Sequence, residues 1–143
     1  MKLLDLNLLV YASDEETVHH ETAAQWLSAT LSGSETVAFA WFALVGFVRI
    51  TTRRRGTRRP WAIDQALDIV DEWLAQPVST VVHPTDRHAA VLRDLLVPLG
   101  VGGNVTSDAH LAALAVEHGA TLCSADTDFA RFTGLNWLNP LVP

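Results

Sequence analysis

Three aspartates stand where the predicted strands end or the predicted helices begin. Asp5 interrupts an otherwise apolar strand, Asp108 opens a helix, and Asp126 directly follows a strand. Ligand sites of parallel α/β sheets gather beyond the carboxyl ends of the strands and at helix N-termini. We therefore expect the three acids to converge. Each alone has an ordinary interpretation: a buried acid that accepts backbone hydrogen bonds, a helix-start acid, and a turn residue.

A cluster of three carboxylates predicts a bound divalent cation. Two carboxylates about 4 Å apart repel each other by roughly 4 kcal/mol at an effective dielectric constant of about 20. The cluster is therefore unfavourable unless a proton or a cation neutralises it, and hard, oxygen-ligated ions such as Mg²⁺ do so. Such a site holds a phosphodiester and activates water for in-line attack. Asp128 either joins this site, if the backbone after Asp126 is extended, or caps the turn before Phe129.

The elements that must position these acids alternate along the chain. A short apolar run predicts a buried strand, and apolar residues at helical spacing predict helices. A capping box at residues 13–16 marks the first helix, and Thr106 and Ser107 are predicted to cap the helix that has Asp108 in its first turn. This alternation predicts an α/β fold with a parallel sheet. The predicted strands span residues 3–11, 36–40, 78–82 and 120–125, and the predicted helices span 13–31, 41–50, 60–76, 85–98 and 106–118.

Length and composition predict one small intracellular domain. The chain has 143 residues and one cysteine, Cys123, so we expect a single domain over residues 1–143 without an internal disulfide. Asp5 stands where a signal peptide would keep its apolar run, and no stretch approaches the roughly 18 apolar residues of a membrane span. We therefore expect a cytoplasmic protein that does not associate with a membrane.

Charge is distributed unevenly along the chain. Ten basic and sixteen acidic residues give a net charge of −6, which argues against nucleic-acid binding through bulk charge. Nine of the ten basic residues are nevertheless arginine, and six fall within one short stretch. The stretch is either a solvated loop paired with the acids at residues 64–72 or a set of contacts to RNA phosphates. We favour the RNA contacts, because a basic rim offsets the repulsion between RNA and a cleft of carboxylates. These residues are Arg49, Arg53, Arg54, Arg55, Arg58 and Arg59.

Other chemistries of α/β folds lack the residues that they require. Receiver domains and haloacid-dehalogenase-type phosphatases need a lysine near the phosphoryl group, and Lys2 is the only lysine. Residues 100–104 lack the third glycine of a dinucleotide loop, and the chain has no P-loop. Ser124 and Cys123 have no histidine at a motif distance, which disfavours a nucleophilic mechanism.

Three segments, in order along the chain, resemble the motifs of PIN-domain ribonucleases. Residues 4–11 are similar to the opening strand of that family, residues 103–115 to the helix that carries its third acid, and residues 122–132 to its closing strand and acidic loop. Residues 46–52 and 134–141 resemble one subgroup, the VapC-type toxins of type II toxin–antitoxin systems.

The resemblance implies a three-layer α/β/α sandwich around a central parallel sheet, and cleavage of RNA with Mg²⁺ or Mn²⁺. It also implies a homodimer and neutralisation by an antitoxin protein encoded beside the toxin. It makes Asp5, Asp108 and Asp126 catalytic acids that bind the metal, with Asp128 as a further metal-binding acid. In the same way Asn7 supports Asp5 and Ser124 hydrogen-bonds within the site, and we expect Thr106 to assist with phosphate oxygens at the helix start.

One position departs from the family pattern. Many members carry a glutamate in the segment that corresponds to residues 43–49, which has no acid here, and Glu35 lies before the preceding strand. The second metal ion of a two-metal scheme is therefore in question. Two functions remain open: a metal-dependent endoribonuclease that is the toxin of a toxin–antitoxin pair, or a catalytically weak PIN-like module that binds RNA or protein.

Overall fold

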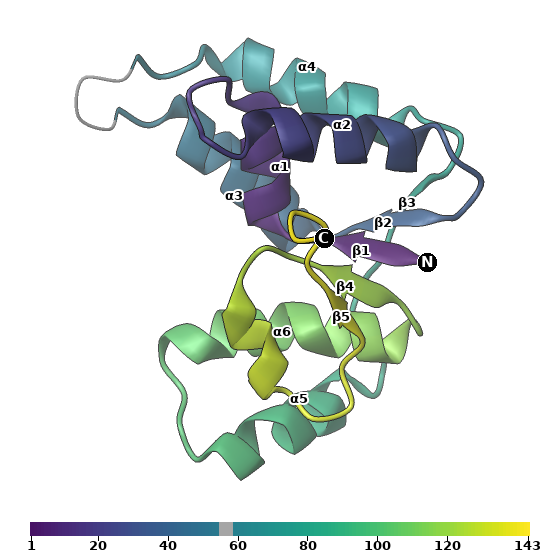
Figure 1. The fold of residues 1–143 in the computed structure, drawn as a ribbon. Helices are drawn as coiled ribbons and strands as arrows, with labels where there is room; N and C mark the ends of the chain where they lie inside the picture. The colour runs from purple at the N-terminus through teal and green to yellow at the C-terminus, as the bar shows by residue number, and fades with distance from the viewer. Residues whose placement is uncertain (55–58) are drawn as a thin grey trace.

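The fold is a five-stranded sheet between two layers of helices (Figure 1). The computed structural model describes residues 1–54 and 59–143. The strand order is β3-β2-β1-β4-β5, and each neighbouring pair is parallel. The expected α/β/α sandwich with a parallel sheet is thus confirmed. The elements are β1 (Lys2–Leu4), α1 (Leu6–Ser13), α2 (His20–Leu31), β2 (Val37–Phe39), α3 (Trp41–Thr52), α4 (Ile63–Leu74), β3 (Ser79–Val81), α5 (His88–Leu96), η1 (Val97–Leu99), α6 (Asn104–Glu117), β4 (Thr121–Cys123), η2 (Thr127–Arg131) and β5 (Trp137–Leu138).

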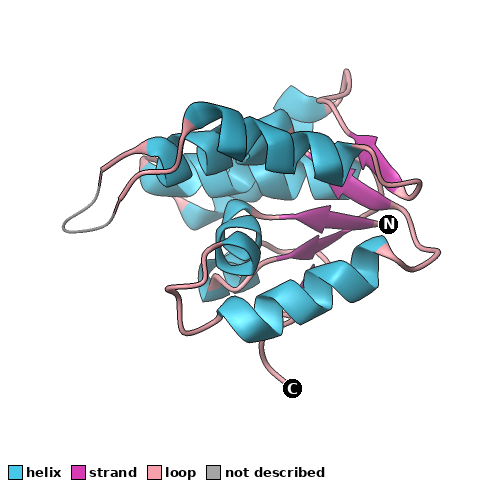
Figure 2. Ribbon diagram, turned by 90° about the horizontal axis from the view of Figure 1, so that it is seen from above, coloured by secondary structure: helices cyan, strands magenta, loops and turns pink. Residues whose placement is uncertain are grey.

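Both faces of the sheet are buried because successive strand residues point to opposite sides. Leu4 and Cys123 pack into the core under α1–α4, whereas Leu3 and Leu122 pack into the core that includes α6. Figure 2 shows helices on both sides of the strands. No helix in the two described ranges is long and apolar enough to cross a bilayer. The carboxyl ends of the strands remain as the edge where a ligand site forms.

The prediction of one strand over residues 3–11 is wrong, because β1 ends at Leu4 and α1 begins at Leu6. Asp5 is the N-cap of α1, and its Oδ1 accepts a hydrogen bond from the Leu6 backbone N–H at 2.7 Å. An apolar run suits a buried helix as well as a buried strand, and a capping aspartate decides where the helix begins. Asp5 therefore lies at the carboxyl end of β1 and not in the middle of a strand.

Two predicted helix starts are also displaced. Ser13 ends α1, the acids at residues 14–16 follow it with Asp14 as the C-cap, and α2 begins only at His20. Helix α6 begins at Asn104, after Gly103, whose φ of 62° favours glycine. Thr106 and Ser107 therefore lie inside the first turn and do not cap the helix. Asp108 is the fifth helical residue, so it lies beyond the first turn.

The short edge strand β5 was not predicted, because two residues carry no readable periodicity. It nevertheless fixes the segment that follows β4. The Ser124 backbone N–H donates to the Leu138 carbonyl at 3.0 Å, and the Ser124 carbonyl accepts from the Trp137 Nε1–H at 3.0 Å. Strand β5 thus fixes the backbone of Ser124 through both its N–H and its carbonyl group.

Candidate metal centre

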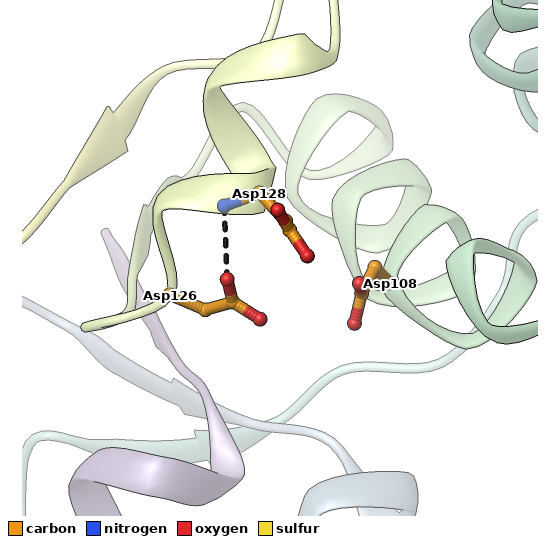
Figure 3. A group of neighbouring side chains, drawn as sticks. All are labelled: Asp108, Asp126 and Asp128. Atoms are coloured by element: carbon orange, nitrogen blue, oxygen red, sulfur yellow. Dashed lines mark hydrogen bonds between the residues drawn. The ribbon is translucent and has the colours of Figure 1, made fainter.

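Three aspartate carboxylates face one another at the carboxyl edge of the sheet (Figure 3). Asp108 comes from α6, and Asp126 and Asp128 come from the segment that follows β4. One oxygen from each carboxylate lies within 4.8 Å of the corresponding oxygens of the other two. The structure therefore brings together Asp108 and Asp126 as expected, with Asp128 as the third member of the acid cluster.

The short helix η2 sets the spacing of Asp126 and Asp128. Asp126 is its N-cap, and the Asp126 Oδ1 accepts a hydrogen bond from the Asp128 backbone N–H at 2.8 Å. Asp128 thus lies in the first turn of a 3₁₀ helix, neither in extended backbone nor as the cap of a turn. Phe129, next along η2, is buried in the core and anchors the helix beneath the acids.

Asp5 joins this edge through a chain of hydrogen bonds. Its Oδ2 accepts from the Ser124 Oγ–H at 2.6 Å. The Ser124 Oγ in turn accepts from the Asn7 Nδ2–H at 3.1 Å and from the Asp126 backbone N–H at 3.0 Å. Asn7 therefore acts on Asp5 through the fully buried Ser124. Among the described residues, the carboxylates close enough to share one ion are those of the acid cluster, and Asp5 stands beside them.

Burial and mutual repulsion raise the pKa values of two of these carboxyl groups. The pKa of Asp108 rises from 3.8 to about 6, first because of burial and then because of the negative charges of the other three aspartates. The pKa of Asp5 is also raised, because burial outweighs the hydrogen bond from Ser124, and the charge of Asp126 adds to the effect. The four carboxylates therefore lie close enough to repel one another, and added positive charge relieves that repulsion.

The donor set fits a hard divalent cation. The acid cluster offers carboxylate oxygens alone, without histidine or cysteine. Asp108 and Asp126 are half-buried and Asp128 is exposed, so the cluster is open to solvent on one side. Mg²⁺ takes one or two carboxylates and completes its shell with water and phosphate oxygens, which such an open cluster allows.

The predicted arginine patch lies on the side of the molecule formed by α1–α4 (Figure 1). Arg49 is on α3, and Arg53, Arg54 and Arg59 flank the segment 55–58; all four are exposed. Arg55 and Arg58 lie outside the described residues. The sequence prediction missed a different cation, Arg131 at the end of η2, whose positive charge lowers the pKa of Asp108.

Two further predicted positions lie apart from the acid cluster. Thr106 is exposed in the first turn of α6, and no hydrogen bond found among the described residues links its side chain to the acids. Glu35 lies before β2, at the opposite edge of the sheet, where its carboxylate pairs with the Lys2 ammonium at 2.9 Å and with the terminal amine at 3.6 Å. Glu35 therefore does not replace the glutamate that is absent from residues 43–49.

Comparisons with known proteins agree with this site and fold. The family model of the PIN domain matches residues 2–135. Ribonuclease VapC37 of Mycobacterium tuberculosis is 45% identical over 140 residues, which cover 98% of this chain and 97% of the relative. Ribonuclease VapC33 of the same species is 38% identical over 141 residues, which cover 99% of each.

Solved structures share the fold at low sequence identity. VapBC2 from Rickettsia felis, bound to a DNA fragment from its promoter, matches with a TM-score of 0.73 and 18% identity over 96% of this chain and 97% of that one. Mycobacterium tuberculosis VapC20, a sarcin-ricin loop cleaving toxin, matches with a TM-score of 0.67 and 20% identity over 95% and 99%. The family model and the relatives at 45% and 38% identity show that this chain belongs to the PIN-domain family and, within it, to the VapC ribonucleases.

Proposed function

We propose that this chain is a metal-dependent endoribonuclease that acts as the toxin of a toxin–antitoxin pair. The observation that carries the proposal is the convergence of three carboxylates at the strand carboxyl ends, with Asp5 beside them. The 45% identity to a ribonuclease supports the same chemistry. When bound, Mg²⁺ or Mn²⁺ would supply positive charge to the phosphate and would lower the pKa of a nearby water molecule.

The residues of the site divide into ligands and positioning groups. Asp108, Asp126 and Asp128 hold the ion, and Asp5 is the further catalytic acid. The Asp5 oxygens retain lone pairs after accepting from Ser124 and from the α1 backbone, so they remain able to bind an ion or a water molecule. Ser124 fixes the direction of the Asp5 carboxylate. The exposed arginines beside residues 55–58 contact RNA phosphates in this proposal, because a negative cleft alone repels RNA.

A second candidate is a catalytically weak module that binds RNA or protein. It is favoured by one observation: α3 carries no acid between residues 43 and 49, and Glu35 is held at the opposite edge of the sheet. A site with four aspartates and no glutamate is then a binding site of one ion, with slow hydrolysis.

Mn²⁺ should raise the melting temperature of the protein, and the increase should shrink as the pH falls through about 6. At a hundredfold excess over Kd the ion contributes about 2.7 kcal/mol, which corresponds to roughly 8 °C for a chain of this size. Below the Asp108 pKa of about 6 a proton occupies this carboxyl group and the ion must displace it. Differential scanning fluorimetry on both sides of this pH measures the effect.

The matched control is Asp94→Asn, which removes an exposed carboxylate from α5. This variant should respond to Mn²⁺ as the parent protein does, whereas Asp126→Asn should lose most of the shift. A shift of equal size in the parent protein and in Asp126→Asn would place the ion elsewhere and contradict the proposed ligand set.

An apolar groove on α3 is our proposed docking site for the antitoxin. The groove has a volume of about 390 Å³ and is lined by Trp41, Phe42, Val45 and Arg49, together with part of α1. Trp41 and Phe42 are each 49% exposed and Val45 is 60% exposed. Large apolar side chains gathered on one surface mark a protein interface. The solved VapBC neighbours favour an antitoxin as the occupant. The homodimer remains a prediction.

Val45→Glu should weaken binding of the protein encoded by the neighbouring reading frame by at least about tenfold, because a buried charge opposes docking. Val18→Glu is the matched control, since Val18 is 93% exposed and lies outside the groove. Calorimetric titration measures both. Equal affinity of the two variants would show that this face of α3 is not part of the antitoxin interface.

A further inference from the structure

Arg131 is a cation held beside the acid cluster. It is the last residue of η2, and its Nε–H donates to the Asp128 backbone carbonyl at 3.4 Å. Its Nη2 lies 3.9 Å from the Asp128 Oδ2. The guanidinium is also close enough to Asp108 for its charge to lower the pKa of that carboxyl group. Arg131 therefore shares the edge of the sheet at which the four aspartates meet.

Stability does not account for this arginine. The contact to Asp128 is long, and the two side chains are 45% and 60% exposed. Exposed ion pairs of this kind contribute about 0–1 kcal/mol. The contacts found for the Arg131 guanidinium among the described residues are both to Asp128, and a guanidinium carries five N–H donors in a planar fork. The donors that Asp128 does not use match the oxygens of a phosphate group.

Charge balance at the cluster points to the same ligand. Four carboxylates repel an RNA phosphate, and one divalent ion offsets only half of their formal charge. If the Asp128 carboxylate held a bound ion, it would pair less with Arg131, whose contact to it is already long at 3.9 Å. The guanidinium would then be available to an anion at the acid cluster. The arginine patch on the α3 side contacts other parts of the RNA in the proposed function.

We propose that Arg131 binds the RNA phosphate that lies at the acid cluster and so positions the bond to be cleaved. The inference rests on the proposed ribonuclease function and adds a substrate-binding residue to it. Arginine suits this task better than lysine, because its planar fork binds two phosphate oxygens at once and fixes their orientation.

The test compares Arg131→Ala and Arg131→Lys with the parent protein on an RNA that the parent protein cleaves. Arg93→Ala, which removes an exposed arginine from the last turn of α5, is the matched control. For Arg131→Ala we expect KM to rise about tenfold. We also expect the negative slope of log(kcat/KM) against log salt concentration to become less steep by about one, which is the effect of one lost phosphate contact. Arg131→Lys should restore the salt slope and only part of KM.

The outcomes separate this inference from the function on which it rests. A parent protein that cleaves no RNA in Mg²⁺ or Mn²⁺ overturns the proposed function and this inference together. If the parent protein cleaves RNA but Arg131→Ala keeps its KM and salt slope, the inference alone is overturned. The inference is also overturned if Arg131→Ala changes only the affinity for Mn²⁺ and the melting temperature. Arg131 would then act as a counter-charge to the acids and not as a phosphate ligand.

Discussion

Replacement of Asp108 by asparagine should reduce RNA cleavage by about a hundredfold or more. Asparagine keeps the shape of the side chain but removes one negative ligand from the acid cluster. The loss corresponds to about 2.7 kcal/mol of transition-state stabilisation, within the several kcal/mol that a correctly held metal ion supplies to a phosphoryl oxygen. Single-turnover cleavage of an RNA substrate in Mg²⁺ measures it. Cleavage at the parental rate would show that Asp108 has no part in the chemistry.

The same variant should be more stable than the parent protein when metal is absent, which excludes misfolding as the cause of lost activity. The pKa of Asp108 is about 6 in the folded protein, above its ordinary value of 3.8. A carboxyl group with a raised pKa destabilises the folded state once it is charged, so the penalty is absent below pH 3.8 and complete above about pH 6. The advantage of Asp108→Asn in urea unfolding should therefore appear across this range and persist at neutral pH.

Glu117→Ala should destabilise the protein by about 3 kcal/mol, because it removes one partner from a buried charged network. The Glu117 side chain is fully buried at the end of α6. Its Oε1 accepts from the Thr85 backbone N–H at 3.0 Å and from the Thr85 hydroxyl at 2.5 Å, and its Oε2 pairs with His88 Nδ1 at 2.5 Å. His88 Nε2 lies 3.0 Å from His110 Nδ1 on α6. The network therefore ties α5 to the helix that carries Asp108.

The pKa of Glu117 indicates how this penalty varies with pH. Burial raises that pKa, but the hydrogen bonds from Thr85 and His88 outweigh burial and lower it overall. Since the charged form is the one that the fold stabilises, the contribution of Glu117 is present above its ordinary pKa of 4.5 and is lost as the pH falls through the lower folded value.

Thermal unfolding at neutral pH measures the loss, which corresponds to roughly 10 °C in melting temperature. Glu72→Ala, on the exposed face of α4, is the matched control and should melt close to the parent protein. If Glu117→Ala and Glu72→Ala have the same melting temperature, the Glu117 carboxylate does not hold α5 on α6.

The convergence of Asp108 and Asp126 was predictable because the carboxyl ends of parallel strands and the N-terminal ends of the helices beside them lie at one edge of the sheet. Asp126 follows β4, and Asp108 lies near the start of α6. The local structure around Asp5 was not predictable in the same way, since an apolar run gives the same signal for a buried strand and for a buried helix. A single hydrogen bond from the α1 backbone to Asp5 decides between them.

Other features depend on local backbone geometry or on contacts between distant parts of the chain. The start of α6 depends on the positive φ of Gly103, and the sequence prediction placed the cap three or four residues too late, at Thr106 or Ser107. Glu117 has the sequence signature of an ordinary exposed helical acid, and only its contacts with Thr85 and His88, 32 and 29 positions away, make it a buried anchor. The role proposed for Arg131 depends on its proximity to Asp108 on α6, which no local sequence pattern indicates.

The most direct measurement is RNA cleavage by the parent protein and by Asp108→Asn, each after treatment with EDTA and again after Mn²⁺ is restored. If the acid cluster is the metal centre of a ribonuclease, only the parent protein with restored Mn²⁺ cleaves RNA efficiently. Cleavage that survives EDTA, or cleavage by Asp108→Asn that matches the parent protein once Mn²⁺ is restored, would contradict it.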